Sequence, residues 1–90
     1  MDSTNNGSVI KIHCDYFELK AMWIQQIMED ISKMYAWDDM KPDQREAIHM
    51  ILIKLSRIIY GDYNHIDHWE DIAGYAQLVV NRLTNEETKR

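Results

Sequence analysis

Two aspartates four residues apart carry the clearest chemical signal in this sequence. Asp67 and Asp71 lie at the start of the stretch DHWEDIAGYAQLVV, where apolar residues recur at helical spacing. Because residues four apart share one face of a helix, the two carboxylates can converge on one cation or one basic partner. Gly74 and Tyr75 follow in the same stretch, and a glycine inside a helix indicates close approach of another helix, a partner or a ligand. Tyr75 is therefore a candidate ligand-binding residue, with a core or interface anchor as the alternative.

The same aspartates also fit an ordinary structural role. Asp67 is a good N-cap residue, and Glu70 stands three positions later, where a capping box places an acid. In this alternative Asp67 caps the helix, and Asp71 pairs with a cation of the preceding helix instead of a metal ion.

Lys54 and Arg57 are the candidate cations. They lie three residues apart in a segment rich in Ile and Leu. Since a charged side chain in such a segment must reach water or find a partner, the sequence predicts an ion pair between Lys54 or Arg57 and Asp71. The functional alternative gives Lys54 and Arg57 the phosphates of a bound nucleotide, for which a guanidinium fork is well shaped.

A magnesium site would use the same aspartates. Mg²⁺ needs several hard oxygen ligands, so hydrolysis of nucleotide phosphates requires about three or four carboxylates from two helices. Asp67 and Asp71 supply two, and Glu18 is the candidate from an earlier helix. Glu29 and Asp30 lie about three turns further along that helix and are not expected to reach the same ion. The candidate metal ligands are therefore Asp67, Asp71 and Glu18.

The composition describes a small globular protein. Of its 90 residues 46% are hydrophobic, which is too apolar for a disordered chain, while charged residues interrupt the apolar runs too often for a membrane span. The net charge of −5 and the scattered basic residues argue against a nucleic-acid partner. The single cysteine, Cys14, cannot form an internal disulfide, and the polar N-terminus does not resemble a signal peptide, so we expect a cytoplasmic protein.

Long stretches without Gly or Pro predict an all-α fold. Apolar residues at steps of three or four predict helices over about 15–34, 42–60 and 67–83, the second beginning at a proline. The third helix is expected to bury one set of apolar residues on its inner face: Ile72, Ala76, Val79 and Leu83. We therefore predict a three-helix antiparallel bundle.

The helices are expected to form one domain over residues 15–84. A short flexible N-terminal arm over 1–14 precedes it, and a charged tail over 85–90 follows. The second helix is apolar on more than one side, which is typical of a helix that is central or shared between subunits. Because 90 residues form only a thin core, we expect a homodimer that completes the bundle.

The segment 41–79 resembles a family of small phage and prophage proteins of unassigned function. The resemblance rests on AIHMILIKLSR, ending at Arg57, and on DHWEDIAGYA, beginning at Asp67. This family is in turn similar to the MazG-like all-α nucleoside triphosphate pyrophosphohydrolases. The resemblance implies a MazG-like half-bundle and places Lys54, Arg57, Asp67 and Asp71 at matched positions. The chain departs from these enzymes because its first helix has no Glu-x-x-Glu, and it lacks the family's Tyr-Gly-Asp-Pro before that helix.

Two functions follow from these observations. The first is a non-catalytic phage-type interaction module that binds a host protein, or a nucleotide-linked factor, in the bacterial cytoplasm. The alternative is a Mg²⁺-dependent nucleoside triphosphate pyrophosphohydrolase or nucleotide-binding protein, with Lys54 and Arg57 on phosphate and Asp67 and Asp71 on the metal. The small size, the acidic charge and the missing Glu-x-x-Glu favour the first, whereas the Lys-x-x-Arg and the paired aspartates favour the second.

Overall fold

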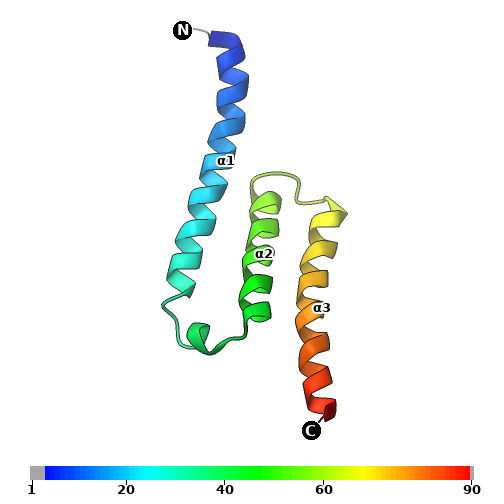
Figure 1. Cartoon of the computed structure of the whole chain (residues 1–90). Helices are drawn as coiled ribbons and strands as arrows, with labels where there is room; N and C mark the ends of the chain where they lie inside the picture. Colours follow the sequence, from blue (N-terminus) through cyan, green and yellow to red (C-terminus); the bar gives the residue numbers. More distant parts are fainter. Residues whose placement is uncertain (1–3, 90) are drawn as a thin grey trace.

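Three α-helices and one short 3-10 helix make up the computed structural model, which describes the backbone of residues 4–89 and the side chains of residues 16–87 (Figure 1). Helix α1 spans Thr4–Ile31, η1 spans Trp37–Asp39, α2 spans Pro42–Ile59 and α3 spans Ile66–Lys89. The prediction of an all-α helical bundle is confirmed. No helix in the described part of the chain is both long enough and apolar enough to cross a membrane.

The helices lie side by side in one layer, with α2 between α1 and α3 and antiparallel to both (Figure 1). The Cα atoms span 65 × 31 × 15 Å, so this layer is about half as thick as it is wide. Among the described side chains, three apolar ones are buried, and all of them come from α2: Ala47, Leu52 and Ile58. The prediction that the second helix is central is therefore confirmed.

Local interactions fix the start of α2. Pro42 occupies the first helical position, as predicted, and the Gln44 side chain accepts a hydrogen bond from the Lys41 backbone N–H at 2.9 Å. Arg45 then ties the preceding turn to α2, because its guanidinium donates to the carbonyls of Trp37 (2.9 Å) and Asp38 (2.8 Å) and lies 5.8 Å from the centre of the Trp37 ring. These contacts position η1 against the first turns of α2.

Both outer helices are longer than the sequence predicted. Helix α1 begins at Thr4, so the predicted arm over 1–14 is helical from that residue onward, and residues 1–3 lie outside the described residues. Helix α3 continues to Lys89, so the predicted tail is helical over 85–89. An ion pair between Arg82 and Glu86 (2.6 Å) supports this last part of α3, because residues four apart are neighbours on a helix surface.

Two of the four residues predicted for the inner face of α3 are more exposed than expected. Ile72 and Val79 are half-buried, whereas Ala76 and Leu83 are exposed. The apolar residues of this helix form two adjacent stripes: one packs on α2, and the other is exposed, with Ala76 at the border of a hollow against Ile48 and Ile51 of α2. Sequence spacing could not separate the two stripes because both repeat every three or four residues.

The loop between α2 and α3 contains the turn chemistry expected for 62–66. Asp62 accepts a hydrogen bond from the Asn64 N–H at 2.9 Å, and the Trp69 indole donates to the Tyr63 carbonyl at 2.9 Å. Helix α3 begins at Ile66, so Asp67 lies inside the first turn and the prediction that it caps the helix is wrong. Its carboxylate still lies near the positive end of the helix dipole, 3.6 Å from His65 Nε2.

Gly61, which follows α2, and Gly74, which lies within α3, differ in their surroundings. A Cβ on Gly61, which follows the C-cap residue Tyr60, would lie 2.7 Å from the Arg57 carbonyl oxygen, so this position has no room for a side chain. A Cβ on Gly74 would meet no atom within 4 Å. The expected approach of the second helix to Gly74 is therefore wrong.

These surroundings predict opposite effects of alanine at the two glycines. Gly74→Ala should raise the free energy of unfolding by about 0.5–1 kcal/mol, because alanine costs less backbone entropy inside a helix and meets no neighbour here. Gly61→Ala should lower it, because the new methyl group collides with a backbone carbonyl. Urea denaturation of both variants measures the difference. A destabilised Gly74→Ala variant would contradict the open surroundings of that position.

Candidate functional site

An ion pair joins the predicted site residues of α2 and α3. Lys54 Nζ lies 2.8 Å from Asp71 Oδ2. The Lys54 side chain is only 12% exposed, whereas the Asp71 side chain is 46% exposed, so the contact holds a largely buried ammonium at the edge of the seam between the helices. The predicted pairing of Asp71 with a cation of the second helix is confirmed, with Lys54 as the partner.

The ion pair changes the titration of Asp71. The Lys54 hydrogen bond, together with the positive charges of Lys54, His68 and Arg57, lowers the pKa of the Asp71 carboxyl below its ordinary value of 3.8, against the opposing effect of burial. Arg57 itself is exposed and acts on Asp71 through its charge. Asp71, Lys54 and Arg57 therefore form one charged cluster near the loop between α2 and α3. The sequence predicted that these residues lie together.

A second cluster, which sequence reasoning missed, lies at the other end of the seam. Arg82 Nε donates to Asp43 Oδ2 at 2.6 Å, and Arg82 Nη1 donates to Glu86 Oε2 at 2.6 Å. The hydrogen bond from Arg82 lowers the pKa of Asp43 below 3.8, and the hydrogen bond to Asp43 raises the pKa of Arg82. The only sequence signal was a lone arginine on an amphipathic helix, and it could not name a partner 39 residues away.

The two clusters set the register of α2 against α3. Asp43 and Lys54 are 11 residues apart on α2, and their partners Asp71 and Arg82 are also 11 residues apart on α3. This spacing is about three helical turns, or roughly 16 Å. Antiparallel helices with equal spacings between their charges can satisfy both pairs at once, and a shift by one turn would separate both.

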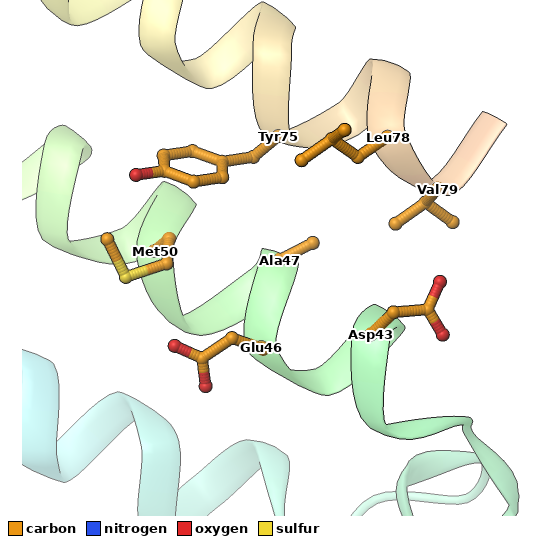
Figure 2. Close-up of a pocket in the computed structure, with 7 residues that line it drawn as sticks. All are labelled: Asp43, Glu46, Ala47, Met50, Tyr75, Leu78 and Val79. Atoms are coloured by element: carbon orange, nitrogen blue, oxygen red, sulfur yellow. The ribbon is translucent and has the colours of Figure 1, made fainter. Parts of the chain in front are cut away.

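An apolar hollow of about 230 Å³ lies between the two clusters (Figure 2). Tyr75, Leu78 and Val79 of α3 face Ala47 and Met50 of α2 across it. Asp43 and Glu46 of α2 also line it, and in Figure 2 the Glu46 carboxylate points away from α3. Tyr75, predicted to bind a ligand, therefore contributes to a concave surface.

The predicted metal ligands occupy different parts of the structure. Asp71 is engaged by Lys54, and Asp67 is an exposed residue of the first turn of α3 that lies near His65. Glu18 is exposed on α1, and α2 separates α1 from α3 (Figure 1). Within the described residues, no three side chains of His, Cys, Asp or Glu are grouped closely enough to hold a metal ion. The structure brings Asp71 together with Lys54 and Arg57, and it does not bring Glu18 to this cluster.

Comparison with models of known protein families, with curated proteins and with solved structures finds no match for this chain.

Removal of the Asp71 charge should destabilise the fold more than removal of its neighbour's charge. Asp71→Asn leaves the largely buried Lys54 ammonium without an anionic partner, which costs more than the loss of an exposed carboxylate at Glu70. Glu70→Gln is the matched control because it also converts one acid of α3 to its amide. Urea denaturation should give a lower free energy of unfolding for Asp71→Asn. Equal small effects would refute a stabilising role for the ion pair.

Acid should weaken the seam through Asp43 and Asp71. Both pKa values are lowered on folding, so these carboxylates stabilise the protein above about pH 4, and this stabilisation is lost as the pH falls through their folded pKa values. The free energy of unfolding should therefore decrease below about pH 4. The Asp43→Asn/Asp71→Asn variant should show a flatter pH dependence in this range, measured by urea denaturation at each pH. A variant as acid-sensitive as the wild type would contradict this assignment.

Proposed function

We propose that this chain is a non-catalytic interaction module that binds a basic amphipathic segment of another protein in the hollow between α2 and α3. The observation that carries the proposal is the open apolar hollow with carboxylates on one side (Figure 2). The resemblance of 41–79 to small phage proteins gives the context: the partner is a host protein in the bacterial cytoplasm.

The size of the hollow favours a side chain over a whole ligand. Sites for small molecules usually measure about 300–1,000 Å³. The hollow, at about 230 Å³, is smaller and suits a single Leu, Met or Phe side chain of a bound helix. Leu78 remains 65% exposed at its edge, so a bound apolar residue would cover surface that now faces water.

The charge around the hollow favours a basic partner. The Glu46 side chain is 67% exposed, and its ion-pair contact is a long one to His49 Nδ1 at 3.9 Å. Asp43 is already paired with Arg82, so Glu46 is the carboxylate beside the hollow that can meet a new cation. The net charge of −5 attracts a basic segment from a distance as well.

The nucleotide alternative has less support from the arrangement of these groups. Lys54, its first candidate for a phosphate contact, is largely buried and held by Asp71. A nucleotide would have to compete with this carboxylate for the ammonium and would meet the acidic surface around it. Arg57 is exposed and would be left as the main phosphate contact.

The test is a titration with a synthetic helical peptide that carries Leu and Lys at amphipathic spacing. Methyl NMR signals of Met50, Leu78 and Val79 should shift on addition of the peptide, and the affinity should fall as salt is raised. Leu78→Lys should weaken binding at least tenfold, because it places a cation and a long side chain at the edge of the hollow. An all-Glu version of the peptide is the charge control and should not bind.

Two results would overturn the proposal. One is the absence of methyl shifts with the basic peptide. The other is a titration with ATP and Mg²⁺ that shifts signals of Lys54 and Arg57 instead, which would favour the pyrophosphohydrolase alternative.

A further inference from the structure

Helix α3 carries an uncovered apolar stripe on the broad face of the molecule that lies opposite the hollow of Figure 2. The members of the stripe recur at regular spacing. They lie on α3 at alternating steps of three and four residues, and each is exposed: Ile66, Trp69, Ala73, Ala76, Val80 and Leu83. Spacing of this kind is the a and d pattern of a coiled coil, in which a stripe faces another helix. Ala76 and Leu78 are two residues apart and thus point to nearly opposite sides of α3, so the stripe and the hollow of Figure 2 lie on different faces of the layer.

The order of side-chain sizes along the stripe is symmetric about its centre. Two large residues stand at each end, and two alanines stand in the middle. If two copies of α3 pair in antiparallel fashion about a two-fold axis near Gly74 and Tyr75, Ile66 of one copy lies opposite Leu83 of the other. In the same arrangement Trp69 lies opposite Val80, and Ala73 lies opposite Ala76. Such self-complementarity is what a two-fold interface requires.

We propose that α3 pairs with α3 of a second copy of this chain, antiparallel, through the Ile66–Leu83 stripe. The small residues at the centre let the two backbones approach closely, and the larger residues fill the space toward the ends. A parallel pairing would point the two helix dipoles in the same direction, which is unfavourable. The antiparallel pairing sets each dipole against the opposite dipole of the second copy.

In the proposed dimer, a second hollow on this face receives Trp69 of the second copy, the largest residue of the stripe. It measures about 310 Å³ and lies between α2 and α3, with Met40, Gln44, Ile48 and Ile51 on one side and Ala76 on the other. The register of the seam sets the Gln44 to Ile48 turn of α2 beside Val80 of α3. Because Val80 lies opposite Trp69 of the second copy, the 51% exposed indole reaches the level of this hollow, and the symmetry repeats the contact.

The solvent-accessible surface of the protein is larger than that of a compact monomer of the same mass. The surface is 7047 Å², whereas a folded monomer of 10.8 kDa is expected to expose about 5,500 Å². The radius of gyration of 17.5 Å also exceeds the roughly 12 Å of a compact domain of this length. The surplus area is larger than the roughly 800 Å² that each partner buries in a standard interface.

The mass of the protein in solution tests this inference separately from the proposed function. Sedimentation of the wild type should give twice the mass of 10.8 kDa. Ala76→Lys should give the monomer mass with its helical circular dichroism retained, because position 76 is exposed on α3 but central in the contact. Leu78→Lys, two residues away on the other face, is the matched control and should remain a dimer. A monomeric wild type, or a dimer that survives Ala76→Lys, would overturn the inference.

Cross-linking tests the orientation of the pair. In a Cys14→Ser background, Ile66→Cys mixed with Leu83→Cys should form a disulfide between the two chains. Either variant alone should not link to itself, because identical positions at the ends of the stripe are separated by roughly 25 Å in the antiparallel pairing. Self-linked Ile66→Cys would show a parallel pairing and overturn the proposal. Peptide binding by Leu78→Lys and by Ala76→Lys then reports on the hollow of Figure 2 independently of dimer formation.

Discussion

The register between α2 and α3 depends on two ion pairs three helical turns apart. Lys54 with Asp71 closes the loop end of the seam, and Asp43 with Arg82 closes the other end. The apolar residues between them can meet only in this alignment, which positions both hollows of the seam. Each cation lowers the pKa of its aspartate, because a hydrogen bond from a cation favours the charged carboxylate.

A single layer of three helices has no interior of its own. Helix α2 is covered by α1 on one side and by α3 on the other, so the buried apolar side chains among those described all belong to α2 (Figure 1). The two broad faces of the layer remain open to solvent. This arrangement explains why so many large apolar side chains, including Ile66 and Trp69, are exposed in a chain with a high hydrophobic fraction.

The two faces of the α2 and α3 pair differ in their chemistry, and this difference separates the two proposals. One face has an apolar hollow beside Glu46 and Asp43, which suits an apolar anchor with a neighbouring cation. The other face has an uncharged stripe with small residues at its centre, which suits a second copy of α3. A dimer formed through the stripe would leave both copies of the first hollow open and would present two binding sites to one partner.

The helical class, the start of α2 at Pro42 and the pairing of Asp71 with a cation of α2 could be predicted from the sequence, because each follows from local spacing or from the need of a buried charge for a partner. It could not identify the Asp43 and Arg82 pair, since these residues lie 39 positions apart and nothing local links them. Which apolar stripe of α3 packs on α2 depends on contacts between helices and could not be read from the sequence. Both stripes have helical spacing, and the choice depends on which one the ion pairs turn toward the neighbouring helix.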